Sequence, residues 1–408
     1  MVKAFKALVQ HYDTLRLNLD GNSLKFNELI LFREVIVEII EIGDSDELPV
    51  VCQEMRAEVN VRLGYPFKVA IIQQEGHADR LFITMHHLVI DGISWRILLE
   101  SFYQVYNQLL DNLAVELPPK TASLKDWSET INAHAETTKA QNEREYWSKV
   151  DQQSFMVRTD YETEDWSVRN LAKESITLSI RQSQYLLSQA IRKLNVDIQA
   201  IFNTALLLTL KEFNGTNHAK VELENHGRHL AGVDTSRSIG WFTSMFPFQV
   251  SLLEEGDMLD QIKHVHECLQ SIPNHGIGYG IHKFLLKTLN NSGNAMSEVR
   301  FNYLGQFGAE LNNELFNYSL EDHGGESHPD NHITAKLEFN LMVINQELLI
   351  TLNYNKEAYH ESTIQSILNV FQLYLIEIIE VAQEQHSSIS TEFEFANLED
   401  DDLKALFD

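Results

Sequence analysis

The segment from Met85 to Trp95 constrains this chain most, because a short polar run there separates two clear patterns. Residues 81–84 form an apolar run of strand length, and residues 95–106 carry apolar side chains at helical spacing. A strand, a short loop and a helix therefore place His86 and His87 at a strand end. Neighbouring strand residues point to opposite faces, so the pair is poorly suited to chelating one ion. We expect one imidazole to face a cavity and the other to pack, although two core histidines are a plainer interpretation.

The wider pattern, His-His-x-x-x-Asp-Gly over residues 86–92, resembles the signature of the condensation-domain superfamily of nonribosomal peptide synthetases. That superfamily is related in fold to chloramphenicol acetyltransferase. The continuation over residues 93–98, Ile-Ser-Trp-Arg-Ile-Leu, is similar to the epimerization branch of the superfamily. The resemblance implies that the second histidine, His87, works on the substrate.

The same resemblance implies a structural role for Asp91. This acid stands directly before a turn glycine, Gly92, in the loop that must aim the second histidine. We expect Asp91 to hold the loop through a buried ion pair, with Arg228 or Arg237 as its partner. His86 is also expected to be structural.

Composition and charge exclude several classes of protein. The chain has 408 residues, of which 44% are hydrophobic and 22% charged, as in ordinary globular proteins. Its formal charge of −27 argues against nucleic acid as a partner, because phosphate contacts need clustered Lys and Arg. Cys52 and Cys268 lack disulfide or metal-ligand spacing, which favours a reducing, cytoplasmic location. No signal-peptide pattern opens the chain, and no run approaches the ~18 apolar residues of a membrane span.

Alternating strand and helix patterns predict an α/β fold. The resemblance implies two chloramphenicol-acetyltransferase-like lobes with a substrate tunnel between them. We place the boundary after the charged, irregular segment 151–169, so the lobes are residues 1–170 and 171–408. A hairpin is predicted over residues 15–26, a strand over 35–42 and a helix over 46–61. Family members carry a few dozen further residues at the start, so we expect a first lobe without its usual N-terminal strand.

The second lobe shows strand and helix patterns up to its last amphipathic helix. Helices are predicted over 182–194, 198–213 and 361–382, and a strand pair over 333–343 and 348–354. The two tryptophans of the quoted motifs, Trp95 and Trp241, are interpreted as core aromatics rather than substrate contacts.

Glu224 ends an apolar strand in this lobe. A carboxylate in that place is most often a salt-bridge partner. Residues 224–229, Glu-Asn-His-Gly-Arg-His, nevertheless resemble the epimerization motif Glu-Gly-His-Gly-Arg-Glu, whose first glutamate is catalytic in the family. Asn225 and His229 depart from that motif, and Glu224 keeps the catalytic position.

Three further segments resemble the family in the order that it shows. They are residues 237–247 (Arg-Ser-Ile-Gly-Trp-Phe-Thr-Ser-Met-Phe-Pro), 276–280 (Gly-Ile-Gly-Tyr-Gly) and 301–306 (Phe-Asn-Tyr-Leu-Gly-Gln). The glycine-rich segment lacks the Lys-Ser/Thr of a phosphate-binding loop. Five ordered motifs between residues 86 and 306 therefore carry the resemblance.

The implied reaction is inversion at Cα of an aminoacyl or peptidyl thioester, carried on the 4′-phosphopantetheine arm of a peptidyl carrier protein. Inversion needs two titratable groups on opposite faces of the carbon, or one mobile group. His87 and Glu224 are the candidates, with burial expected to raise the pKa of the glutamate. Ser94, through amides at a helix start, and Asn302 or Tyr303 are the candidate donors to the thioester oxygen.

Two alternatives stay open. A condensation domain would use His87 to assist amine attack and form a peptide bond, although the Glu224 motif argues against it. A silent docking module would bind carrier proteins without chemistry. The resemblance implies no metal and no cofactor of the domain's own, and it allows a downstream condensation domain as a partner. No HExxH or CxxC pattern offers a metal site.

Overall fold

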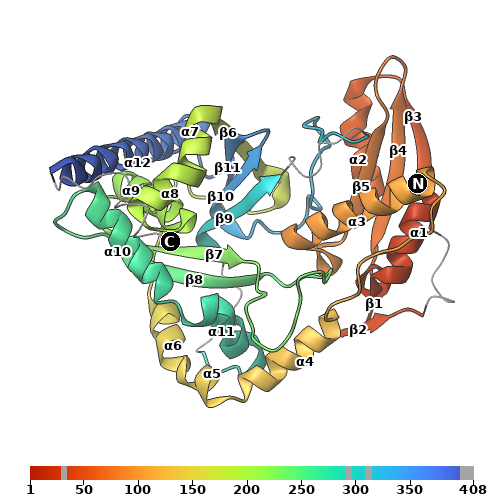
Figure 1. Cartoon of the computed structure of the whole chain (residues 1–408), viewed down its shortest axis with the longest axis horizontal. Helices are drawn as coiled ribbons and strands as arrows, with labels where there is room; N and C mark the ends of the chain where they lie inside the picture. Colours follow the sequence, from red (N-terminus) through yellow and green to blue (C-terminus); the bar gives the residue numbers. More distant parts are fainter. Residues whose placement is uncertain (29–34, 290–295, 308–314, 396–408) are drawn as a thin grey trace.

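A computed structural model describes residues 1–28, 35–289, 296–307 and 315–395 of the chain. Figure 1 shows two lobes side by side, joined by a string of helices along one edge. The first lobe contains α1 (Val2–His11), β1 (Leu17–Asp20), β2 (Ser23–Phe26), β3 (Glu38–Ile42), α2 (Leu48–Ala57), β4 (Phe67–Gln74), β5 (Arg80–Met85) and α3 (Gly92–Leu110). The joining helices are α4 (Leu124–Ala135), α5 (Thr138–Asn142) and α6 (Arg144–Gln152).

The second lobe is larger. Its first half contains β6 (Leu171–Leu178), α7 (Ile180–Gln184), the π-helix η5 (Tyr185–Ala190), α8 (Ile191–Leu194), α9 (Ile198–Asn214), β7 (His218–Asn225) and β8 (Ser244–Ser251). Its second half contains α10 (Met258–Gln270), α11 (Ile277–Gly280), the π-helix η7 (Ile281–Leu285), β9 (Ser297–Phe307), β10 (Ala335–Ile344), β11 (Glu347–Asn355) and α12 (Glu361–Phe395).

The first lobe is a small sheet packed against helices. Its three strands lie in the order β3-β4-β5, with β3 parallel and β5 antiparallel to β4. Helices α1 and α3 pack through apolar faces, and the rings of Phe5 and Phe102 lie 4.9 Å apart between centroids. β1 and β2 form a separate hairpin, so the hairpin predicted over 15–26 is confirmed.

The second lobe is built on a six-stranded sheet in the order β6-β11-β10-β9-β7-β8. β9 runs parallel to both of its neighbours, while the outer pairs are antiparallel. One face of the sheet is covered by α9 and α12, whose buried side chains form the largest core of the chain. The opposite face turns toward the space between the lobes (Figure 1).

The α/β class and the two-lobed arrangement predicted from the sequence are confirmed. Two element boundaries are wrong. The first-lobe strand begins at Glu38 rather than residue 35, and the helix predicted over 46–61 is a 3-10 turn, Ser45–Glu47, followed by the shorter α2. Pro49 explains this division, because proline is accepted in the first turn of a helix and not within it.

The chain begins to pack against the second lobe before the boundary predicted at residue 170. Trp147, Phe155 and Val157 are buried in the core of the second lobe. The indole of Trp147 donates to Glu143 Oε2 at 3.1 Å, and Glu143 also accepts a hydrogen bond from Asn274 of the second lobe. The irregular segment before residue 170 therefore lies on the second lobe, because its few apolar residues fill that core.

Two segments of the second lobe reach across to the first. The chain between β7 and β8 passes between the lobes, and Ile239 is buried in the first lobe's core (Figure 1). Residues 321–325 contact the first lobe at another place, where the Glu321 carboxylate pairs with the Arg80 guanidinium at 2.6 Å. The lobes are thus held together by these two segments of the second lobe as well as by the joining helices.

Helix α12 is, within the described part of the chain, the one helix long and apolar enough to span a membrane by length and composition. Its window runs from Glu361 to Gln385. One face of the helix lies on the second-lobe core, where Phe371, Leu375 and Ile378 are fully buried. This packing accounts for the apolar face of α12.

If α12 is a core helix, truncation of its buried face is costly. Phe371 is fully buried against Phe339, so Phe371→Ala should lower the free energy of unfolding by about 3–5 kcal/mol. Leu373 lies on the same helix but is 63% exposed, so Leu373→Ala should change it by less than about 0.5 kcal/mol. Equal effects of the two variants in chemical denaturation would contradict the packing described here.

Candidate functional site

The two adjacent histidines follow the end of β5. The chain leaves the strand at Met85 and turns through His86 into a short 3-10 turn, His87–Val89. His86 Nδ1 accepts the Leu88 N–H at 3.1 Å and so caps this turn. Both imidazoles are exposed, so the expectation that one of them packs is wrong. The strand ends before the pair, and strand alternation therefore does not apply to it.

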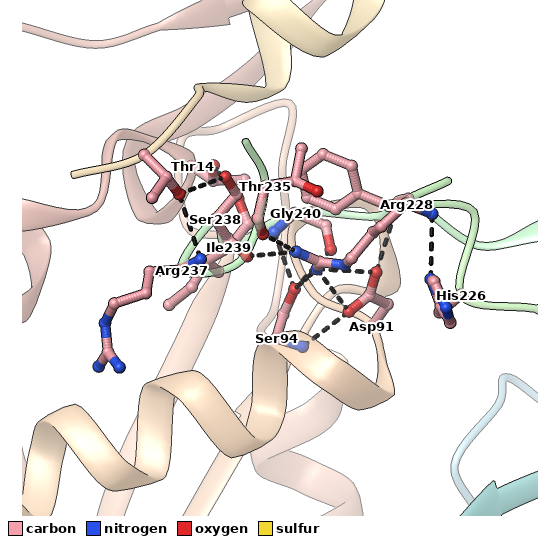
Figure 2. A network of polar contacts seen from close by, with 12 residues as sticks. Thr14, Asp91, Ser94, His226, Arg228, Thr235, Arg237, Ser238, Ile239 and Gly240 are labelled. Carbon is pink, nitrogen blue, oxygen red and sulfur yellow. Dashed lines mark hydrogen bonds and ion pairs between the residues drawn. The ribbon is translucent and has the colours of Figure 1, made fainter. Parts of the chain in front are cut away.

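Asp91 is the N-cap of α3 and the centre of a buried polar network between the lobes (Figure 2). Its Oδ1 accepts the Ser94 N–H at 2.7 Å, and its Oδ2 accepts the Phe242 N–H at 3.0 Å. Arg228 Nη2 lies 3.2 Å from Asp91 Oδ1. The two side chains are only 2% and 6% exposed, so this ion pair is shielded from water.

Arg228 extends the same network within the second lobe. Its Nη1 donates to the backbone oxygens of Thr235 and Ser238 at 2.7 and 2.9 Å. Its guanidinium lies 4.1 Å from the centroid of the Phe242 ring. Burial lowers the pKa of Arg228, and Asp91 opposes that effect. One arginine therefore fixes the segment between β7 and β8 onto the start of α3.

Two residues expected at this site have other places. Arg237 points away from Asp91 in Figure 2 and pairs with Glu100 of α3 at 3.4 Å. Ser94 is fully buried, its N–H is taken by Asp91, and its hydroxyl donates to Gly240 O at 2.9 Å. The expectation that Ser94 binds substrate is therefore wrong, because its polar groups join the two lobes instead.

The glycine of the Glu224 motif is required by close packing. Gly227 has a φ of +68°, and a Cβ there would lie 1.8 Å from the Phe242 carbonyl oxygen. A side chain is therefore excluded at this position by its backbone conformation and by its neighbour.

Glu224 stands near the end of β7, and strand alternation puts it on the same sheet face as Glu222. Glu222, Arg300 and Glu338 form one row across that face, because the strand register pairs Glu222 with Arg300 and Arg300 with Glu338. Arg300 Nη2 lies 2.6 Å from Glu222 Oε2, and its Nη1 lies 3.3 Å from Glu338 Oε1. Glu224 is two residues further along β7, and its Oε1 lies 3.9 Å from Arg300 Nε. One guanidinium thus faces several carboxylates.

The surroundings of Glu224 shift its pKa upward. Burial raises the pKa of this carboxyl, Arg300 opposes the rise, and the two neighbouring glutamates add to it. His87 lowers the pKa of Glu224 slightly, so the imidazole of one lobe is within electrostatic reach of the carboxylate of the other. Asn302 Nδ2 donates to Glu224 Oε2 at 2.8 Å and so orients it.

Tyr303 follows Asn302 in β9 and therefore faces the opposite side of the sheet. Its ring packs edge-on against Phe202 of α9 at 5.1 Å between centroids. The expectation that Tyr303 contacts the substrate is wrong, because this side chain belongs to the core beneath the sheet. Asn302 is on the same face as Glu224.

Trp241 was interpreted as a core aromatic, and this is wrong. Its side chain is 44% exposed, and its ring lies 5.5 Å from the His87 ring between centroids. Trp95 packs partly buried against the first-lobe core. The two tryptophans therefore differ in their surroundings, although both follow closely on motif residues.

The two departures from the family motif meet in space. His229 Nε2 and Asn225 Oδ1 form a hydrogen bond of 3.1 Å. The His229 ring lies between those of His226 and His275, at 4.1 and 4.0 Å between centroids. Partial burial, together with these two imidazoles, lowers the pKa of His229 to about 4. A stack of imidazoles therefore lies beside the end of β7.

Sequence reasoning missed Arg300 and the two glutamates that share it. Strand alternation alone places Glu222 on the face of Glu224, and Arg300 on the face of Asn302. The register between β7 and β9 is what brings these pairs together, and no local pattern carries that register. Within the described ranges, no group of three or more His, Cys, Asp or Glu residues is arranged to hold a metal ion.

The fold is shared with solved condensation-type structures. The epimerization domain from the third module of tyrocidine synthetase B superimposes with a TM-score of 0.85 and 29% identity, covering 93% of this chain and 88% of that one. The condensation domain from Monacolin K polyketide synthase superimposes with a TM-score of 0.71 and 13% identity, over 92% and 88% of the two chains. The second likeness shows the fold alone.

The sequence profile of the Condensation domain family matches residues 1–398, and the chain belongs to this family. Gramicidin S synthase 1 of Brevibacillus brevis is 31% identical over all of this chain, which spans 39% of that protein. Tyrocidine synthase 1 of Brevibacillus parabrevis is 30% identical over 95% of this chain and 38% of its own length. The chain thus spans less than two fifths of either relative.

The interlobe ion pair predicts a large loss on removal of Asp91. Asp91→Ala leaves Arg228 buried and unpaired, so the free energy of unfolding should fall by about 3–5 kcal/mol. Glu100→Ala breaks an exposed pair with Arg237 and should cost at most about 1 kcal/mol. Thermal melting of both variants checks this, and an unchanged melting temperature for Asp91→Ala would refute a structural role.

The imidazole stack predicts an acid-sensitive stability. The pKa of His229 is about 4 in the folded chain, against about 6.5 for an unperturbed histidine. The unfolded chain therefore binds a proton at His229 first, so the contribution of His229 lowers stability as the pH drops from about 6.5 to 4 and is constant below. His229→Gln should lose less stability over this interval than the parent chain, as measured by melting.

The control for that experiment is His328→Gln, because His328 is exposed in a loop and lies outside the stack. It should follow the parent chain at every pH. Parallel curves for parent and His229→Gln would mean that the stack does not resist protonation.

Proposed function

We propose that this domain epimerizes an aminoacyl or peptidyl group at Cα, with the group held as a thioester on the 4′-phosphopantetheine arm of a peptidyl carrier protein. The observation that carries the proposal is the placement of Glu224. It is a mostly buried carboxylate with a raised pKa, oriented by Asn302 and within electrostatic reach of His87. The similarity to a solved epimerization domain supports the same assignment.

The chemistry assigns one side of the carbon to each lobe. The Glu224 carboxylate removes the α-proton, and the electron pair moves into the thioester carbonyl to form an enolate. Protonation of Cα from the other side by the His87 imidazolium gives the inverted centre. Glu224 and His87 then regain their starting protonation by exchange with solvent. A carboxyl whose pKa is raised toward neutrality serves both directions of this reaction.

The developing negative charge on the thioester oxygen needs donors. Asn302 is on the correct face of the sheet, and we assign it this role together with orientation of Glu224. The first amides of a helix lack intrahelical acceptors, and Asp91 takes only the third amide of α3 as its cap. The sequence suggested amides at the helix start near Ser94 for this role, and we assign it to those of Gly92 and Ile93.

Condensation remains the alternative within the same family. There His87 would assist attack by an amine on the thioester, and Glu224 would have no part in the chemistry. A docking module without chemistry is the second alternative. The carrier protein and its arm belong to the proposal in all three cases.

Proton exchange separates these readings. A carrier-bound L-aminoacyl or L-peptidyl thioester in heavy water should gain deuterium at Cα and drift toward a mixture of L and D forms, with no acceptor present. Glu224→Gln keeps the shape of the side chain but removes its titration, so exchange should fall by about 10²–10⁴-fold. Glu100→Gln is the matched control, because Glu100 is 63% exposed on α3 and has no part in the proposed chemistry.

Peptide-bond formation with full retention, insensitive to Glu224→Gln, would overturn epimerization in favour of condensation. Carrier binding without exchange or condensation would leave only the docking module. His87→Ala should abolish inversion while allowing slow one-sided deuterium uptake by Glu224.

A further inference from the structure

A large cavity lies next to the candidate site, lined by neighbours of His87 and Glu224 rather than by these two residues. It has a volume of about 1040 Å³ and lies between α4, the start of β8 and the η7 turn. Trp241, which faces His87, lines it, and so does Met245, which stands opposite Glu224 in the register of β7 and β8. Two residues of the lining thus adjoin His87 and Glu224, so a substrate held at these two groups would have the cavity within reach.

The walls of this cavity are mainly apolar. Trp127 and Ile131 of α4 form one side, and Ile281 and Phe284 of η7 form another. Phe284 and Leu285 are 61% and 45% exposed, so this wall of the cavity presents apolar side chains to solvent. The walls therefore favour apolar groups over polar ones.

Two of the charged groups in the lining compensate each other. Glu222 and Arg300 both line the cavity, and they form an ion pair of 2.6 Å with each other. The Lys283 ammonium lies 5.3 Å from the centroid of the Tyr279 ring and 5.5 Å from that of Phe284. Two acidic ligand side chains would have to give up water here and would meet one ammonium in the lining, that of Lys283.

The size of the cavity exceeds the need of a single residue. Pockets for drug-sized ligands measure about 300–1,000 Å³, and this one lies at the top of that range. Such ligands have the bulk of a short peptide. One amino-acid side chain would leave most of the apolar wall in contact with water.

We propose that this cavity holds the upstream residues of a peptidyl thioester, and that these residues are apolar and uncharged. The inference rests on the proposed epimerization and names its substrate: a peptidyl group rather than a single aminoacyl group. The cavity contributes binding energy from residues that do not react, and this energy positions Cα between the two lobes.

The test compares carrier-bound thioesters that share the same reacting residue. Deuterium uptake at Cα is measured for L-Phe alone, for Leu-Leu-L-Phe and for Asp-Asp-L-Phe. The parent chain should process Leu-Leu-L-Phe with a kcat/KM at least about tenfold above that of L-Phe, and the acidic peptide should lose this gain. Equal kcat/KM for all three substrates would overturn the inference while leaving epimerization in place.

Filling the cavity provides the second arm. Ser128 lines the cavity from an exposed position on α4, so Ser128→Trp adds bulk there with little risk to the fold. The ratio of peptidyl to aminoacyl kcat/KM should fall about tenfold. Glu129→Trp, one residue along α4 and outside the lining, is the control and should keep the parent ratio.

The outcomes distinguish the two proposals. No deuterium uptake from any of the three substrates contradicts the proposed function itself. Uptake from all of them, with a ratio that Ser128→Trp leaves unchanged, contradicts only the peptidyl cavity. Melting curves of both tryptophan variants show that each is folded before its ratio is compared.

Discussion

The contact between Arg228 and Asp91 is the interaction on which the arrangement of the site depends. Arg228 belongs to the segment between β7 and β8, and Asp91 begins α3 in the other lobe. Taking both charges out of water is costly, and the cost is offset because each partner also has hydrogen bonds to backbone groups. The same residues thereby set the distance between the turn that carries His87 and the strand that carries Glu224.

On the second lobe, strand register arranges the polar side chains of the candidate site. Alternation along β7 and β9 puts acids, an arginine and an amide on one face, and the parallel pairing of these strands brings them into rows. The other face of the same strands holds Tyr303 and Phe301 against α9. A single sheet therefore separates a polar working surface from a dry core.

The sequence was sufficient for the fold class, the hairpin, the long helices α9 and α12 and the family, because these follow from periodicity and ordered motifs. It also identified Arg228 as a candidate partner of Asp91. It failed at Ser94, Tyr303 and Trp241, where the outcome depends on what another lobe or strand places nearby. A serine at a helix start and a tyrosine beside an asparagine look like ligand contacts until the register and the interlobe network are known.

The charge row around Arg300 has a consequence for substitutions at Glu224. Glu222 and Glu338 hold Arg300 without help from Glu224, which lies further from the guanidinium and is repelled by both. Glu224, the candidate catalytic carboxylate, thus contributes least to the ion pairs of Arg300. A chain without the Glu224 carboxylate would therefore keep the ion pairs of Arg300 with Glu222 and Glu338.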